Sequence, residues 1–286
     1  QGDSRQAIEI AGLTIGLGKR LKFPDDYFTL YNAINLQQYK LINNQSFFSF
    51  SNGYSNNINY NIKIGRNSTD QLIYPRRGSN FSLSLKITPP YSMFDGIDDY
   101  SSISDQEKYA WIEYYKWKFK SSWFSAFSEK LVLNTRVEMG LLGAYNNNLG
   151  VAPFERFYVG GDGMSGMGYQ FDGRELISLR GYSNNSISPQ TGATIYSKYT
   201  TELRYAISLN PSSTVYALAF LEAGNAWDSF DNYNPFQVKR SAGFGVRLML
   251  PMIGMMGLDY GWGLDDIVGR PDANGGQFHF SIGQQF

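Results

Sequence analysis

The sequence predicts an all-β fold, a transmembrane antiparallel β-barrel of which about eleven strands are present. The first observation behind this prediction is an alternation of apolar and polar residues with a period of two, which recurs along the chain and marks strands with one apolar face. The second is the composition: 16% of the residues are aromatic, with 21 Tyr and 20 Phe, which suits the aromatic girdles of a membrane barrel. A soluble β-sandwich is the alternative, but such large side chains would crowd the face that two packed sheets share.

The end of the chain shows the alternation most clearly. Between Gln277 and Phe286, apolar side chains stand at positions 278, 280, 282 and 286, with polar or small residues between them. A segment of about ten residues matches a tilted strand that crosses a bilayer. We therefore expect Phe278, Phe280 and Ile282 to face lipid and Phe286 to lie at a membrane interface.

Ten further segments carry similar patterns and are predicted as strands. They span residues 11–18, 27–41, 57–67, 80–88, 111–123, 131–142, 194–207, 214–227, 241–250 and 256–265. Single-chain bacterial barrels normally have an even number of strands. The odd count and the abrupt start lead us to expect that residues 1–286 are the C-terminal portion of a barrel whose first strands lie outside this chain.

Composition and charge also limit the expected functions. The chain has 25 basic and 25 acidic residues and no net charge, so nucleic acid is not an expected partner. Cysteine is absent, which excludes disulfides and thiol chemistry. The single histidine, His279, falls on the polar face of the last predicted strand, and we interpret it as a lumen residue rather than a general base. We therefore expect a protein that is not an enzyme and that binds no cofactor or metal ion.

A long connection at about 143–193 interrupts the series of predicted strands. Structureless connections longer than about 15 residues are usually functional or disordered. This one is rich in aromatic residues, arginine and glycine, a composition that favours packing over disorder, so we predict that it folds into the lumen as a plug. The residues expected to pack it there are Phe154, Phe157, Tyr158, Gly160 and Gly161.

Arg180 lies in this connection and would need a partner inside a lumen. We predict that its partner is Glu222, the one carboxylate in a predicted strand that is otherwise apolar on both faces. Such a strand is expected to pack its lumen side against the plugging loop, although a different strand register is the alternative. Gly181 permits a tight turn that could aim the guanidinium, and Tyr182 offers a flat apolar surface beside it.

Four motifs follow one another along the chain in an informative order. They are Phe157-Tyr158-x-Gly160-Gly161, Leu179-Arg180-Gly181-Tyr182, Phe220-x-x-Ala223-Gly224-x-x-Trp227 and the last strand with its aromatic end. Together they resemble the C-terminal barrel of the BamA family, the central subunits of the machinery that assembles β-barrels in the outer membrane. The resemblance covers the chain from Ala11 onward.

This resemblance implies a location in the bacterial outer membrane and a barrel of sixteen strands preceded by periplasmic POTRA domains. About five strands and the POTRA domains would then be outside this chain. The plugging loop would be the sixth extracellular loop of the family. The implied partners are outer-membrane lipids, nascent β-barrel proteins and accessory assembly subunits, including periplasmic lipoproteins.

The resemblance also implies a seam between the first and last strands, where substrate strands would enter. A weakly paired seam exposes backbone N–H and C=O groups that can template an incoming strand. Gly283 would weaken the last strand and let it bend, and it matches the position where the last strand of the family kinks. The alternative is that Gly283 is simply a small residue facing the lumen. The residues assigned to the terminal strand and seam are Phe278, Phe280, Ile282, Gly283 and Phe286.

The predicted function is therefore the folding and insertion of β-barrel proteins into the outer membrane. The alternative is a polypeptide-exporting barrel or a passive pore of the same superfamily. A pore should leave an open channel, whereas an insertase would have its lumen occluded by the loop that carries Arg180.

Overall fold

In the computed structural model, residues 6–44, 49–97, 99–163, 174–210, 213–251 and 254–283 are described. Eleven strands form one antiparallel sheet in the order β1-β2-β3-β4-β5-β6-β9-β10-β11-β12-β13. Their bounds are β1 Ala7–Arg20, β2 Phe28–Ile42, β3 Gly53–Asn67, β4 Arg77–Ile87, β5 Tyr115–Ala126, β6 Leu131–Gly143, β9 Ile195–Asn210, β10 Ser213–Trp227, β11 Lys239–Leu250, β12 Gly254–Gly263 and β13 Gly276–Ile282. The strand pattern in the sequence thus predicted the all-β antiparallel architecture correctly.

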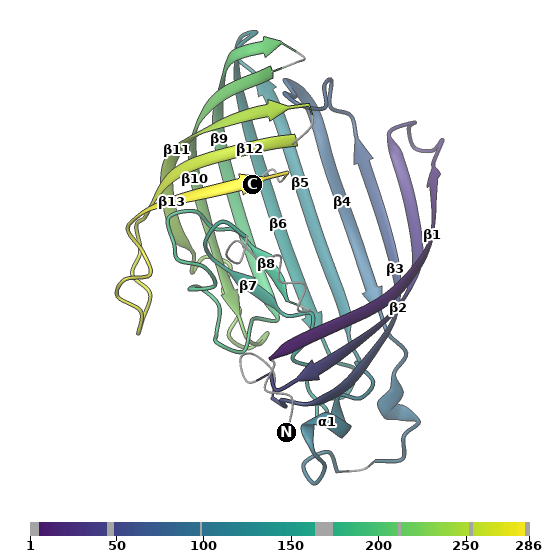
Figure 1. Ribbon diagram of the computed structural model, residues 1–286. Coiled ribbons are helices and arrows are strands. Elements are labelled where there is room, and N and C mark those ends of the chain that lie inside the picture. The colour runs from purple at the N-terminus through teal and green to yellow at the C-terminus, as the bar shows by residue number, and fades with distance from the viewer. Residues whose placement is uncertain are drawn as a thin grey trace.

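The sheet is strongly curled but not closed. Figure 1 shows β1 and β13 at its two edges, with the intervening strands forming a curved wall. Within the described residues β1 pairs only with β2 and β13 only with β12. The strand that contains Ala11 therefore does not pair with the strand that contains Phe280.

Small elements lie in the connections. Strands β7 (Phe157–Val159) and β8 (Glu175–Ile177) pair in parallel within the β6–β9 connection, and Figure 1 shows them on the concave side of the sheet. A short 3-10 helix, η1 (Tyr91–Met93), and a helix α1 (Asp105–Lys108) lie in the β4–β5 connection. Among the described residues, none of the helices has the length and apolarity needed to cross a membrane.

The connections are unequal at the two ends of the sheet. At one end, called the short-turn end, the sheet reverses through brief turns such as residues 127–130. At the other, called the long-loop end, it reverses through residues 88–114 and 144–194. Transmembrane barrels have short periplasmic turns and longer extracellular loops, so this asymmetry gives the sheet a direction.

The alternation in sequence becomes an alternation between the two faces of the sheet. In β13 the side chains of Phe278, Phe280 and Ile282 are exposed on the convex face, whereas His279 and Ser281 are buried on the concave face. The predicted orientation of the last strand is therefore confirmed for these residues, while Phe286 lies outside the described residues. The concave face collects most of the buried charged groups, and we call the space it encloses the lumen.

Candidate functional site

The β6–β9 connection enters the lumen as a folded plug. Phe154, Phe157 and Tyr158 are all buried. Phe154 stacks on Tyr39 of β2 with ring centroids 4.6 Å apart, and Phe157 meets Tyr196 of β9 edge to face at 4.7 Å. The loop therefore contacts both early and late strands of the curved wall, so the aromatic residues expected to pack the plug do lie in its core.

Gly160 and Gly161 let two segments of the plug approach closely. Their φ angles are +128° and +77°, a region that side chains rarely adopt. A Cβ atom on Gly160 would lie 2.6 Å from the carbonyl oxygen of Ser183, and one on Gly161 would overlap the Asn184 side chain. Gly161 forms an antiparallel bridge with Leu179, which brings the Phe-Tyr-x-Gly-Gly motif beside the Leu-Arg-Gly-Tyr motif.

Arg180 is held by carboxylates on three strands. Its side chain is completely buried, and the guanidinium donates to Glu222 of β10 at 2.8 Å and to Glu202 of β9 at 3.0 Å. The third carboxylate, Asp259 of β12, lies 3.4 Å from the Arg180 guanidinium. The contact that the sequence predicts between Arg180 and Glu222 is present, and two further carboxylates share the same cation.

The residues beside Arg180 fix its position. The Arg180 guanidinium lies over the Phe220 ring, 3.6 Å from the centroid, an arrangement that favours a desolvated cation. The backbone N–H of Gly181 donates to Nε2 of His279 at 2.8 Å. This contact places His279 in the lumen as an acceptor for the loop backbone and ties the loop directly to β13.

Gly181 and Tyr182 dock the loop against the last hairpin. Gly181 has φ +84°, and a Cβ atom there would lie 2.6 Å from the backbone nitrogen of Gly263. The buried hydroxyl of Tyr182 donates to the carbonyl oxygen of Arg240 at 2.6 Å. Burial raises the pKa of Tyr182 to about 12, so this hydroxyl stays protonated and remains a donor at neutral pH.

Several charged residues of this site were not named as site residues from the sequence. Glu202 also pairs with Arg136 at 2.7 Å and with Arg204 at 2.6 Å, Glu222 lies 3.2 Å from Lys198, and Arg247 binds Asp259 through both carboxylate oxygens. The sequence did indicate that these residues face the lumen, because they occupy the polar positions of predicted strands. The sequence did not indicate which of these strands lie beside the loop that carries Arg180.

A second anchor holds the loop on β5, another part of the curved wall. Lys116 of β5 is 1% exposed, and its ammonium group lies 2.9 Å from Glu155 and 2.7 Å from Glu175. Burial alone would raise the pKa values of both carboxyl groups, but the neighbouring lysines outweigh burial and hold both pKa values below the usual range. Glu155 has a positive φ of +65°, a conformation that the motif-based interpretation of the loop did not anticipate.

The expectation that the lumen side of β10 packs against the plugging loop needs a correction. Phe220 contacts Arg180 as expected, but Phe220, Tyr216 and Leu218 also share an apolar cluster with Tyr74 toward the short-turn end. Tyr74, from the β3–β4 connection, meets Tyr216 edge to face at 5.1 Å and donates to the carbonyl oxygen of Arg204. A second connection therefore covers this part of β10, and nothing in the local sequence around Tyr74 indicated that distant contact.

Gly283 follows directly after β13. It has φ +70°, and a Cβ atom added there would meet no other atom within 4 Å, while its backbone N–H donates to the carbonyl oxygen of Met255 at 2.7 Å. Gly283 is exposed rather than packed into the lumen. The left-handed conformation of Gly283 ends the extended strand at this residue. This agrees with the predicted bend and not with the alternative, a small residue that faces the lumen.

Comparison with known families identifies the family of this chain. The model of the Omp85 superfamily domain matches residues 3–286. The chain belongs to the Omp85 superfamily. An Omp85 barrel resides in the bacterial outer membrane, so the convex face of this sheet is its lipid face and the long-loop end is the extracellular end.

Three individual proteins show which members of the superfamily this chain is similar to. It is 26% identical over 179 residues to the outer membrane protein assembly factor BamA of Neisseria meningitidis serogroup B (strain ATCC BAA-335 / MC58), a match covering 57% of this chain and 18% of the relative. The crystal structure of BamA from Haemophilus ducreyi lacking POTRA domains 1-3 superposes with a TM-score of 0.66 at 18% identity, covering 98% of this chain and 56% of that one. CdiB from Escherichia coli gives a TM-score of 0.57 at 15% identity, covering 96% of this chain and 45% of that one. The Omp85 chain is thus a BamA-like C-terminal barrel that spans less than a fifth of its curated relative.

Proposed function

We propose that this barrel folds and inserts β-barrel proteins into the bacterial outer membrane through a lateral opening next to β13. The observation that carries the proposal is the shortness of β13, which has seven residues against ten in β12 and ends at the left-handed Gly283. A short strand beside the seam can form only a few backbone hydrogen bonds, so an incoming strand can compete for its backbone groups.

The plugged lumen supports insertion over free passage. The Arg180 loop crosses the lumen and is anchored on β5 through Lys116 and on β9, β10 and β12 through Arg180. A passive pore would need this space open. The loop also touches β13 through Gly181 and His279, so movement of the edge strand and movement of the plug are physically connected.

The chemistry of this function needs no turnover at a catalytic centre. Insertion by strand pairing uses backbone hydrogen bonds and the transfer of apolar side chains into lipid, and its partners would be nascent β-barrel proteins, outer-membrane lipids and accessory subunits such as periplasmic lipoproteins. The histidine in the lumen serves as a hydrogen-bond acceptor for the loop. We therefore propose a non-enzymatic assembly factor without a cofactor.

Site-directed cross-linking tests this proposal. Because the chain has no cysteine, Phe278→Cys on the outer face of β13 gives a single attachment point for a photo-cross-linker. Leu83→Cys on β4 is the matched control, since both side chains are exposed on the convex face and Leu83 lies in the middle of the sheet. The proposal expects nascent barrels to be captured at position 278 and not at 83.

Depletion of the protein separates the two functional classes. An assembly factor should lower the folded amount of many outer-membrane proteins at once, and periplasmic lipoproteins should copurify with it. If depletion instead leaves those proteins at normal levels and stops the export of a particular polypeptide, the exporting-barrel alternative is correct and the insertion proposal is wrong.

A further inference from the structure

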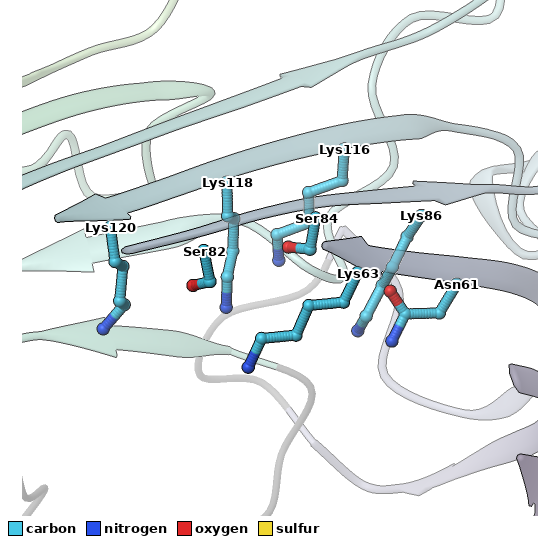
Figure 2. A pocket seen from close by; sticks show the side chains of 8 residues that line it. All are labelled: Asn61, Lys63, Ser82, Ser84, Lys86, Lys116, Lys118 and Lys120. Atoms are coloured by element: carbon cyan, nitrogen blue, oxygen red, sulfur yellow. The ribbon is translucent and has the colours of Figure 1, made fainter. Parts of the chain in front are cut away.

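The lumen wall formed by β3, β4 and β5 is strongly basic. We call Lys63, Lys86, Lys116, Lys118 and Lys120 the lysine wall. Figure 2 shows these five side chains converging on one pocket together with Ser82 and Ser84. The pocket has a volume of about 210 Å³, which is far more than a single water molecule needs.

Strand register arranges these groups in rows across the three strands. Lys63 of β3 stands opposite Ser84 of β4, and Ser84 stands opposite Lys118 of β5. Directly opposed residues have Cβ atoms about 4.5–5.5 Å apart, so a serine stands between two lysines in this row. In the next row Ser82 stands opposite Lys120. The short serine side chains leave room between the long lysines.

The protein's own carboxylates already bind to one end of this wall. Glu155 lies 2.9 Å from the ammonium of Lys116 and 3.4 Å from that of Lys86. Glu175 lies 2.7 Å from Lys116 and 2.5 Å from Lys118. In both cases an oxyanion is held between two ammonium groups from this surface. The lysine wall is therefore built to hold oxyanions, as the plug itself demonstrates.

The carboxylates do not balance the wall. Within the described residues, Glu155, Glu175 and Glu138 are the carboxylates paired with its five ammonium groups. Lys63 forms no ion pair in that part of the chain, and Lys120 has only Glu138, at 2.6 Å. Counted over the described residues, two positive charges are thus in excess at this wall, where the local potential attracts a mobile anion.

We propose that the lysine wall binds a phosphate-bearing anion between Lys63, Ser84 and Lys118, with Lys120 and Ser82 at its margin. A phosphate group carries up to two negative charges and several acceptor oxygens, which matches the excess of two charges and the donors arriving from three strands. The anion is either free phosphate or the headgroup of a phosphorylated lipid. This site is independent of the proposed insertion function.

Calorimetric titration of the purified full-length protein in detergent micelles tests the site. Inorganic phosphate is the first probe and glycerol 3-phosphate, a soluble headgroup analogue, is the second. Lys63→Gln removes the lysine that forms no ion pair among the described residues and should weaken binding of inorganic phosphate about tenfold. Ser84→Ala should weaken it by a smaller factor. Lys22→Gln is the matched control because Lys22 is exposed in the β1–β2 turn outside the wall, and it should bind phosphate like the unaltered protein.

The outcomes are distinct. Tighter binding of glycerol 3-phosphate than of inorganic phosphate would assign the site to a lipid headgroup, and the reverse order to free phosphate. The proposal is overturned if the unaltered protein does not bind either probe at about 10 mM in low salt. It is equally overturned if Lys63→Gln and Lys22→Gln bind as tightly as each other. Cross-linking at Phe278 reports on insertion separately, so the two proposals fail independently.

Discussion

Glu222 binds both the guanidinium and the backbone N–H of Arg180. One carboxylate oxygen accepts from the guanidinium at 2.8 Å, and the other accepts from the backbone N–H of Arg180 at 2.9 Å. The carboxylate therefore fixes the backbone of the loop as well as the side chain. One guanidinium nitrogen donates to both Glu222 and Glu202, and the other lies 3.4 Å from Asp259. A lysine at position 180 could replace the charge but not this planar two-armed group.

Replacing Arg180 with Ala should destabilise the folded barrel substantially. The change leaves Glu222, Glu202 and Asp259 with one cation fewer in a buried site, and breaking such a buried pair costs about 3–5 kcal/mol. Denaturant unfolding in lipid vesicles measures the loss. The control is Arg240→Ala, whose pair with Asp265 is exposed on the arginine side, so solvent screens it and its loss should be much smaller. Equal losses for the two variants would contradict the central role of the buried cluster.

Replacing Gly181 with Ala should loosen the loop more than the same change at Gly269. Both glycines have positive φ, +84° and +76°, so both substitutions introduce backbone strain of about 1–2 kcal/mol. Only at Gly181 would the new Cβ meet the backbone of Gly263, at 2.6 Å, whereas Gly269 faces open space. Protease cleavage within the loop reports on its docking. The steric argument fails if the two variants are cleaved at the same rate.

Aspartate at position 280 should impair assembly far more than aspartate at position 281. Phe280 is exposed on the lipid face, while Ser281 is buried on the lumen side, so only the first change places a charge in hydrocarbon. The fraction of heat-modifiable, folded protein in the membrane measures assembly. A similar folded fraction for both variants would show that the convex face of β13 is not in contact with lipid.

The Lys116 anchor should persist at neutral pH and loosen only in strong acid. Glu155 and Glu175 have pKa values below the usual carboxyl value, so their stabilisation is complete above about pH 4.5 and is lost as the pH falls through their lower folded pKa values. A spin label on Asn147→Cys, an exposed loop position, reports loop mobility across this range.

Lys116→Gln is the matched variant for this titration. Without Lys116, only Lys86 and Lys118 offset the effect of burial, so both carboxyl pKa values should rise and the loop should become mobile at a higher pH than in the unaltered protein. An unchanged transition would mean that Lys116 does not hold the loop.

Much of the fold followed from local sequence. The two-residue alternation placed each strand and assigned its faces, because side chains on a strand point alternately to opposite sides and one face must meet lipid. The plugging loop was also predictable from its aromatic and glycine content, and Glu222 stood out because it is the one carboxylate in an otherwise apolar strand. Each of these inferences uses only the residues of a single strand or a single loop.

The sequence by itself determined the strand pattern, the lipid face and the pairing of Arg180 with Glu222. Tertiary structure alone decided that Glu202 and Asp259 join them, that Lys116 forms a second anchor, and that Tyr74 covers Tyr216 of β10. These contacts join residues far apart in the chain, and their existence depends on the curvature of the sheet and the path of the loop across it. Alternation tells which side of a strand a residue occupies, but only the curled sheet determines what stands opposite that side.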